Sequence, residues 1–221
     1  MRLLLLSDIH ADAAALERVL THARGQGWDE AVFLGDLVGY GERPREALAM
    51  LRSLPLRAAL EGNHEVMMQA LRDGERVAAA PAITQRLLQH LDELQPEELD
   101  FIDNLAVQHE EDGWAAIHGA LRKRFEYLIS VPVARGNAEY MKRDIYFFGH
   151  THVPVAFIER PGGRWTVRPF TGSEGSVTID EGARAFLNPG SVTLSRDRVI
   201  SNSYGIYDTA MRQFTVYRLT G

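Results

Sequence analysis

The sequence predicts an α/β fold in which two β-sheets pack face to face and helices cover their outer sides. In residues 1–64, short apolar segments alternate with helical patterns, an order typical of a parallel sheet flanked by helices. After Leu105, short strand patterns dominate and turn residues such as Pro161-Gly162-Gly163 separate them, which indicates a mostly antiparallel second sheet. No internal repeat or low-complexity linker divides the chain, so we expect residues 1–221 to form one domain.

Composition supports a folded globular protein and excludes several kinds of site. Of the 221 residues, 45% are hydrophobic and 24% are charged, which is enough apolar material for a large core. The chain has 0 cysteines, which excludes disulfides, thiolate ligation of zinc or iron–sulfur clusters, and a cysteine nucleophile. The formal net charge of -6 provides no general basic field that would attract nucleic acid.

The first apolar segment is too short to be a membrane or targeting element. It runs from Leu3 to Leu6, and Asp8 and His10 then interrupt it, whereas a signal peptide needs about 7–15 apolar residues. We therefore expect a cytoplasmic protein without membrane contact. The sequence leaves open whether the chain forms a homo-oligomer.

Three short apolar segments of the first half have the composition of strands buried on both faces. They are Arg2–Ser7, Ala31–Leu34 and Leu56–Leu60. Helices are expected between them, because Asp12 is a suitable N-cap for a helix over residues 12–24 and Pro44 suits the first turn of a second helix. This order of strands and helices predicts a parallel sheet.

The middle of the chain, residues 65–104, has a helical pattern. Part of it is expected to border the functional site, where Gln69, Arg72 and Arg76 would affect substrate choice, while most of it packs as outer helices. Seven strands are predicted after it: Trp114–His118, Ile145–Gly149, Val153–Ile158, Arg164–Phe170, Arg184–Leu187, Tyr204–Tyr207 and Phe214–Leu219.

Polar residues with ligand chemistry follow five of the predicted strands. The carboxyl ends of strands in α/β sheets form a common crevice, so we expect these side chains to converge. They are Asp8 and His10, Asp36, Asn63 and His64, His118, and His150 and His152. The members of two pairs are spaced two residues apart, which in extended backbone places both side chains on the same face.

The set predicts a metal site with oxygen and nitrogen ligands. Three carboxylate or amide positions and four imidazoles make seven potential ligands, more than one ion uses, so two ions with a bridging carboxylate are expected. Taken singly, Asp8 or Asp36 can instead cap a turn or a helix, and His118 can be an interior histidine. Their joint placement favours the metal site. Three further histidines are interpreted as structural or solvent-facing: His22, His90 and His109.

The motifs around these residues resemble those of the calcineurin-like metallophosphoesterases and occur in that family's order. They are Asp8-Ile9-His10, Gly35-Asp36, Gly62-Asn63-His64-Glu65, His118-Gly119 and Gly149-His150-Thr151-His152. Further downstream, Asn188-Pro189-Gly190-Ser191 is similar to the small bacterial phosphodiesterase branch. The resemblance implies a four-layer α/β/β/α sandwich of two mixed sheets flanked by helices, in agreement with the predicted strands.

The resemblance also implies a role for each matching residue. It divides the ligands into one set for each ion and a shared carboxylate: Asp8, His10 and His152; Asn63, His118 and His150; and Asp36 as the bridge. His64 would be the catalytic histidine, which protonates the leaving oxygen or neutralises developing charge. Glu65 is expected to orient the His64 ring or to be an acidic residue in the first turn of a helix, and the two roles can coexist.

The expected activity is that of a binuclear-metal-dependent phosphodiesterase acting on a small phosphodiester or nucleotide. Two ions roughly 3.5–4 Å apart would clamp the phosphate and generate a bridging hydroxide for in-line displacement. Manganese is the first expectation for both ions, and iron, zinc, nickel and cobalt are alternatives. Two other functions stay open: a phosphomonoesterase or nucleotidase, and a catalytically inactive scaffold on the same fold.

Positive charge for gripping the phosphate has no obvious source in the motifs. One branch of the family carries Asp-Arg-Gly after its second motif, but here Leu37 follows Asp36. Other basic residues can supply this charge, although a solvated surface cluster explains each of them equally well. They are Arg43, Arg122, Lys123 and Arg124.

Overall fold

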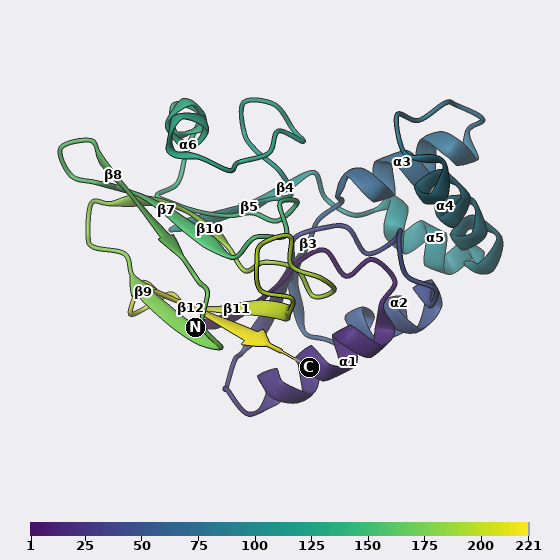
Figure 1. The fold of residues 1–221 in the computed structure, drawn as a ribbon, viewed down its shortest axis with the longest axis horizontal. Helices are drawn as coiled ribbons and strands as arrows, with labels where there is room; N and C mark the ends of the chain where they lie inside the picture. The colour runs from purple at the N-terminus through teal and green to yellow at the C-terminus, as the bar shows by residue number, and fades with distance from the viewer. Residues whose placement is uncertain (221) are drawn as a thin grey trace.

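Two six-stranded mixed sheets form the centre of the computed structural model, which describes residues 1–220 (Figure 1). The first sheet has the strand order β3-β2-β1-β11-β12-β9. Strands β1, β2 and β3 are parallel, and the other neighbours pair antiparallel. The bounds of these strands are β1 Arg2–Leu6, β2 Glu30–Phe33, β3 Leu56–Ala59, β9 Glu174–Thr178, β11 Asn202–Asp208 and β12 Gln213–Leu219.

The second sheet has the order β4-β5-β6-β10-β7-β8. Its central strand β6 pairs in parallel with both β5 and β10, while the remaining pairs are antiparallel. The bounds are β4 Gln108–Glu111, β5 Trp114–Ile117, β6 Ile145–Phe147, β7 Val155–Arg160, β8 Arg164–Pro169 and β10 Arg184–Asn188.

Helices cover the outer faces of both sheets (Figure 1). Helices α1 (Ala13–Arg24) and α2 (Pro44–Arg52) pack on the first sheet, and α6 (Val131–Ala138) packs on the second. Helices α3 (Asn63–Arg72), α4 (Pro81–Glu93) and α5 (Pro96–Asp103) form a lobe beside them, and α4 contacts α2. Within residues 1–220, no helix is long and apolar enough to cross a membrane.

The side chains of β1 show how the layers are held together. Leu4 and Leu6 pack into the core between the first sheet and its helices, whereas Leu3 and Leu5 pack into the core between the two sheets. All four are 0% exposed, which explains why this strand is a continuous apolar run rather than an alternating one. The arrangement confirms the predicted four-layer α/β/β/α sandwich.

The division of the chain between the sheets differs from the sequence-based expectation. The parallel strands β1 to β3 do not form a sheet of their own, because β11 from the second half pairs antiparallel with β1 and brings β12 and β9 with it. This pairing satisfies the backbone of an otherwise open strand edge.

Three elements were not predicted: β4, β9 and α6. Strands β4 and β9 lie at sheet edges and contain polar, partly exposed residues, so they lack the apolar signal of a buried strand. Helix α6 contains Pro132 near its start and Gly136 in its interior, which weakens a helical pattern.

Candidate metal centre

The predicted ligands follow the carboxyl ends of five strands, β1, β2, β3, β5 and β6, and gather in one crevice. Five of them have a left-handed backbone with φ between 49° and 64°: Asp8, His10, Asp36, His150 and His152. Residues other than glycine rarely adopt this conformation. It costs about 1–3 kcal/mol at each position and concentrates at functional sites, so the local strain marks this crevice.

For His150 and His152, the left-handed backbone contradicts the expectation that a two-residue spacing places both side chains on the same face. In extended backbone His150 and His152 would share a face, but here His150 groups with Asp36 and His152 groups with Asp8. Asp8 and His10 do approach one common point, where His10 Nε2 lies 3.9 Å from Asp8 Oδ1. The ligands converge because the backbone turns sharply at the strand ends.

Two glycines let backbone and ligands approach closely. A Cβ atom at Gly62 would lie 2.1 Å from Asp36 Oδ1, and one at Gly149 would lie 1.9 Å from Ser7 Oγ and 3.0 Å from Asp8 Oδ2. A larger residue at either position would displace a ligand carboxylate or its hydrogen-bond partner.

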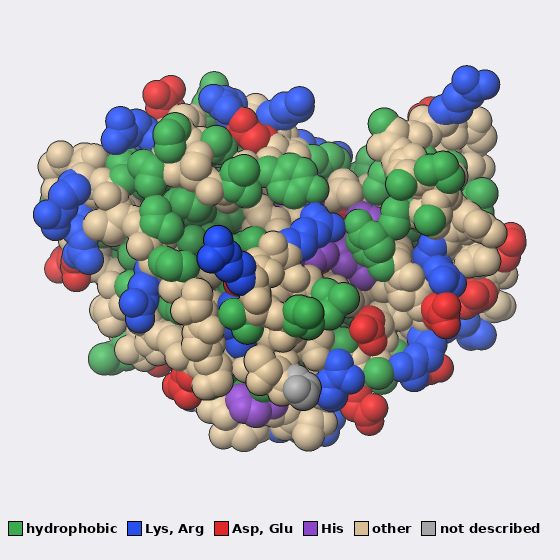
Figure 2. Space-filling model, in the orientation of Figure 1, with side chains coloured by type: hydrophobic (Ala, Val, Ile, Leu, Met, Phe, Trp, Pro, Cys, Tyr) green, Lys and Arg blue, Asp and Glu red, His purple; other side chains and the backbone are tan. Residues whose placement is uncertain are grey.

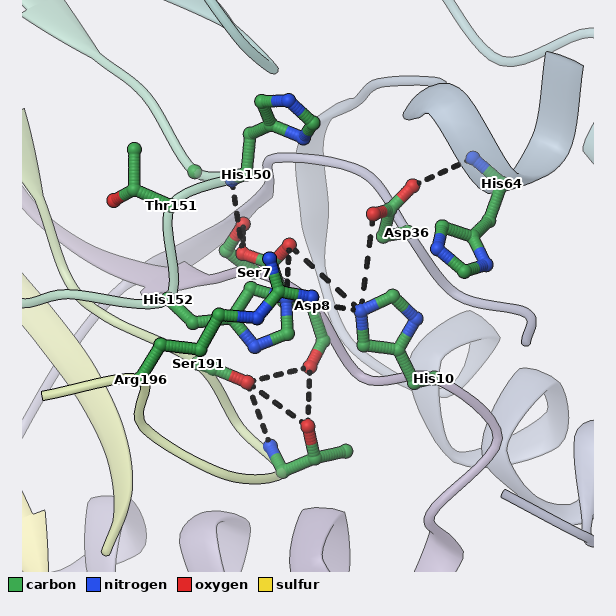
Figure 3. Close-up of polar contacts among 12 residues, drawn as sticks. Ser7, Asp8, His10, Asp36, His64, His150, Thr151, His152, Ser191 and Arg196 are labelled. Atoms are coloured by element: carbon green, nitrogen blue, oxygen red, sulfur yellow. Dashed lines mark hydrogen bonds and ion pairs between the residues drawn. The ribbon is translucent and has the colours of Figure 1, made fainter. Parts of the chain in front are cut away.

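The first cluster of potential ligands consists of Asp8, His10 and His152 (Figure 3). The Nε2 atoms of His10 and His152 lie 3.1 Å apart, and His152 Nε2 lies 3.3 Å from Asp8 Oδ1. Each Nδ1 faces a backbone carbonyl, that of Val38 at 2.9 Å for His10 and that of Leu194 at 3.0 Å for His152. These bonds place a hydrogen on Nδ1 and leave a lone pair on each Nε2.

The donor set of this cluster fits a divalent cation. Two lone pairs and a carboxylate oxygen face the same small volume and repel one another unless positive charge lies among them. Asp8 Oδ1 is buried without a hydrogen-bond partner in the described chain. Asp8 Oδ2 instead accepts from Ser7 Oγ at 2.6 Å and from His150 N at 3.1 Å. The protein therefore holds one oxygen and leaves the other for a ligand.

The second cluster consists of Asp36, His118 and His150, and Asn63 lies against it. His118 Nε2 is 3.4 Å from Asp36 Oδ2 and 3.3 Å from Asn63 Oδ1. His118 Nδ1 donates to a backbone carbonyl at 2.7 Å, and His150 Nε2 donates to the Phe125 carbonyl at 3.2 Å. The ring nitrogens left for a metal ion are His118 Nε2 and His150 Nδ1.

Asp36 belongs to the second cluster and also faces the first. Its Oδ2 atom is 3.8 Å from His10 Nε2 in the first cluster and 3.4 Å from His118 Nε2 in the second. Its Oδ1 atom accepts a hydrogen bond of 2.9 Å from the backbone N–H of His64 (Figure 3). One oxygen is thus fixed while the other faces both clusters, as a bridging ligand requires.

Burial and neighbouring charges set the protonation states of the ligands. Burial opposes ionisation of Asp36, but His118 and His64 outweigh it and hold the pKa of Asp36 well below its usual value. Burial lowers the pKa of His10 to about 3 and that of His150 to about 4. For His118, burial is outweighed by Asp36, which raises the pKa to about 9. Without metal, His118 therefore carries a proton that a cation would replace.

His64 lies beside the clusters at the start of α3. Its ring centroid is 4.6 Å from that of His10, and its Nδ1 atom is buried without a hydrogen-bond partner in the described residues. It also groups with His10 and Asp36 as a third set of close ligand atoms. Burial lowers its pKa. The ring is thus positioned to face a substrate at the centre.

Glu65 does not orient the His64 ring, contrary to one of the two expectations. Its carboxylate is fully buried and accepts four backbone hydrogen bonds, from the N–H groups of Asp36, Leu37, Val38 and Gly62 at 2.7–3.0 Å. Burial and Asp36 raise its pKa to about 7, against the effect of these donors. Glu65 is the helix-end residue of the alternative expectation, and it also fastens the loop that carries Asp36 to α3.

The Asn188-Pro189-Gly190-Ser191 segment forms hydrogen bonds to the loops that carry the potential ligands. Asn188 Nδ2 donates to the Gly149 carbonyl at 2.8 Å and to Thr151 Oγ1 at 3.1 Å. Ser191 Oγ donates to the Asp8 carbonyl at 3.0 Å. This motif therefore ties the His150–His152 loop and the loop after β1 to the end of β10.

The site opens into a hollow of about 240 Å³ between the sandwich and the helical lobe, and histidine side chains are visible at its base (Figure 2). The lobe contributes Met67, residues 78–80 and Ile83 to its wall. Gln69 and Arg72, which were expected at this border, bond to Asp103 instead, and Arg76 is not among the lining residues. The lobe borders the site as predicted, but through small and apolar side chains.

The basic residues singled out from the sequence do not supply charge to this hollow. Arg43, Arg122 and Arg124 are engaged with Glu46, Glu126 and Glu61. The basic residue at the site is Arg196, whose side chain lies beside His152 (Figure 3). Sequence reasoning missed it; the available signal was its position five residues after Ser191 of a recognised motif.

His90 also differs from its expected place on the surface. It is 0% exposed on α4, accepts from the backbone N–H of Gly39 at 3.3 Å and lies 3.0 Å from the Gly41 carbonyl. His90 thereby holds the loop that carries Tyr40. The expectation of a structural role is met, whereas a solvent-facing position is not. His109 lies on strand β4 and pairs with Glu111.

The fold and the two ligand clusters are those expected of metal-dependent phosphoric ester hydrolases. The sequence pattern of the calcineurin-like phosphoesterase superfamily domain matches residues 1–212. The chain therefore belongs to the calcineurin-like phosphoesterase superfamily.

Known proteins agree with this membership. An uncharacterized protein of Methanocaldococcus jannaschii is 30% identical over an aligned length of 213 residues, and the match covers 92% of this chain and 81% of the relative. The crystal structure of a metallophosphoesterase from Sphaerobacter thermophilus has a TM-score of 0.84 at 30% identity, covering 100% of this chain and 89% of that one. A hypothetical protein from Pyrococcus horikoshii, with a TM-score of 0.73 at 11% identity and coverage of 99% and 87%, shares the fold.

Proposed function

We propose that this chain is a binuclear-metal-dependent phosphodiesterase that hydrolyses a small phosphodiester or nucleotide. The observation that carries the proposal is Asp36, because one carboxylate oxygen faces both ligand clusters at 3.4–3.8 Å. A single-ion site needs no such shared ligand. The proposal includes a cytoplasmic location, which cell fractionation tests.

Each residue of the site has a task in this reaction. Asp8, His10 and His152 would hold one ion, Asn63, His118 and His150 would hold the other, and Asp36 would contact both. Two bound divalent ions would supply Lewis-acid activation of the phosphate and of the attacking water. Manganese is the proposed metal, since oxygen and imidazole donors without thiolate suit it as well as iron, zinc, nickel or cobalt.

His64 would act on the substrate rather than on the ions. Burial keeps its imidazole neutral more readily than usual, and the negative charges of Asp36 and Asp8 act in the opposite direction. The two carboxylates stabilise the protonated ring, and in that form His64 can deliver a proton to the departing ester oxygen. The backbone N–H of His64 bonds to Asp36, which supports a joint role for the proposed catalytic ring and the proposed bridging carboxylate.

Elemental analysis of the purified protein and a substrate panel test this proposal together. We expect two metal ions per chain after loading with manganese, and faster turnover of bis-p-nitrophenyl phosphate than of p-nitrophenyl phosphate. Turnover of the monoester alone would favour a phosphomonoesterase. Absence of turnover with manganese, iron, zinc, nickel and cobalt would favour a scaffold without activity.

A further inference from the structure

A bridge of three side chains lies across the entrance of the metal centre. The Arg196 guanidinium donates to the hydroxyl of Tyr40 at 3.2 Å and to that of Tyr127 at 3.4 Å. The Tyr40 ring stands edge-on to His10 with centroids 4.6 Å apart, and the Tyr127 ring stacks on His150 at 4.3 Å. This Tyr40–Arg196–Tyr127 bridge therefore contacts ligands of both clusters.

Two tethers fix the position of Arg196 relative to the centre. Its backbone N–H donates to the carbonyl of His152 at 3.1 Å, so it is bonded directly to a residue of the first cluster. The next residue, Asp197, accepts hydrogen bonds of 2.7 and 2.8 Å from Arg218, whose side chain is 0% exposed. Arg218 also donates to the Val199 carbonyl at 2.6 Å, which attaches the loop that carries Arg196 to this buried side chain at a second point.

The charge of Arg196 is available to a ligand. Among the described residues no carboxylate lies within 4.0 Å of its guanidinium, whereas Arg43, Arg122 and Arg124 are all ion-paired. The two tyrosine hydroxyls use two of the five N–H donors of the guanidinium. Arginine with free donors beside a metal centre suits the non-bridging oxygens of a phosphate.

The bridge separates two hollows that share Tyr40, His152 and Arg196 as wall residues. The smaller one, of about 240 Å³, contains His64. The larger one, of about 560 Å³, lies on the other side of Tyr40 and is walled mainly by apolar surface, including Leu194, which is 60% exposed. The larger volume is within the usual range of about 300–1,000 Å³ for small-molecule sites.

We propose that Arg196 binds the non-bridging oxygens of a phosphodiester and that each hollow receives one of its two ester substituents. The inference rests on the proposed phosphodiesterase function and names its substrate class. His64 lies in the smaller hollow, so the departing substituent belongs there. The larger hollow takes the retained substituent, and its Tyr40 and Leu194 surfaces suit an aromatic or heteroaromatic ring. A monoester would leave this second hollow unused.

Binding of two diesters of equal charge tests the assignment without requiring turnover. The protein is a manganese-loaded His64→Ala variant, and calorimetry compares methyl phenyl phosphate with dimethyl phosphate. We expect methyl phenyl phosphate to bind about tenfold more tightly, since its single ring buries apolar area in the larger hollow. Leu194→Trp, which fills that hollow, should abolish the difference. Ile200→Trp is the matched control on the same loop, where the side chain is 77% exposed, and should preserve it.

The role of Arg196 is tested on the same background. Arg196→Gln should weaken both diesters by about 10–100-fold, the effect of losing a charged hydrogen bond, and Arg196→Lys should weaken them less. Metal content is measured in each variant and should not change. Equal binding of both diesters, or equal effects of Leu194→Trp and Ile200→Trp, would overturn the two-hollow assignment. Unchanged binding in Arg196→Gln would overturn the role of Arg196.

Different measurements test the proposed function and this inference, so either one can be refuted without the other. Turnover by the chain with intact His64 tests the function, whereas the calorimetric pattern tests only which groups the two hollows and Arg196 bind. A chain that shows the expected binding pattern but hydrolyses no diester would refute the phosphodiesterase and support the assignment of the hollows.

Discussion

Replacing Glu65 by glutamine should destabilise the fold and release metal ions. Glu65 Oε1 accepts from the N–H groups of Leu37 and Val38 at 2.8 and 3.0 Å. Its Oε2 accepts from Asp36 and Gly62 at 2.9 and 2.7 Å. Glutamine retains one of the two oxygens, and its amide nitrogen would face the other two N–H donors.

The cost follows from the two backbone N–H groups that lose their acceptor. Each buried N–H left without a partner costs about 1–3 kcal/mol, so the substitution should cost about 2–6 kcal/mol in free energy of unfolding. A chain of this size loses about 2–4 °C in Tm per kcal/mol, which gives a decrease of about 4–24 °C. Because the freed loop carries Asp36, bound metal per chain should fall as well.

Thermal unfolding and elemental analysis of Glu65→Gln measure both effects, and Glu98→Gln is the matched control. Glu98 caps α5 in the same way, with a hydrogen bond of 2.8 Å from the backbone of Gln95, but it is partly exposed and also pairs with Arg45. It should cost less than about 1 kcal/mol. Equal Tm values for the two variants would refute the reasoning. Lower turnover with unchanged stability and metal content would instead assign Glu65 to catalysis.

Three further predictions concern the potential ligands, the proposed catalytic histidine and a buried histidine on α4. Asp36→Asn should lose both ions and His152→Ala mainly one, as metal content per chain will show; retention of two tightly held ions in Asp36→Asn would exclude the bridge. His64→Ala should lower turnover by about 10²–10⁴-fold at unchanged metal content, and a small change would exclude its role in proton transfer. Burial lowers the pKa of His90 from 6.5 to about 4, so the unfolded chain binds more protons in this interval and stability falls with decreasing pH. His90→Gln should reduce the loss of stability between pH 7 and pH 5 by about 2 kcal/mol in urea unfolding, and an unchanged loss would contradict this linkage.

Much of the site was predictable because its potential ligands lie in short local motifs. Asp8, His10 and Asp36 lie two to four residues after a buried apolar strand, and parallel strands bring such ends to one edge. The apolar runs themselves identify the strands, as with the fully buried Leu3–Leu6 segment. Such local patterns can be recognised in the sequence because each reflects the environment of the residues that form it.

Other features could not be predicted because they depend on contacts between distant segments. Glu65 is next to His64 in sequence, but its buried carboxylate turns toward the loop after β2. The spacing of His150 and His152 suggested one face, whereas their left-handed backbone directs them to different clusters. Arg196 belongs to none of the recognised motifs and reaches the centre because its loop is bonded to His152 and to the buried Arg218.

The sequence by itself determined the layered α/β architecture and the seven potential ligands, which follow from hydrophobic periodicity and from the chemistry of side chains at strand ends, both of which act over a few residues. The separate role expected of His64 came from the resemblance of its motif to those of the family. Only the tertiary structure decided that β11 joins the sheet of β1, that Asp36 faces both clusters, and that Arg196 divides the entrance into two hollows. Such relations join residues that are far apart in the chain, and packing of the whole molecule fixes them.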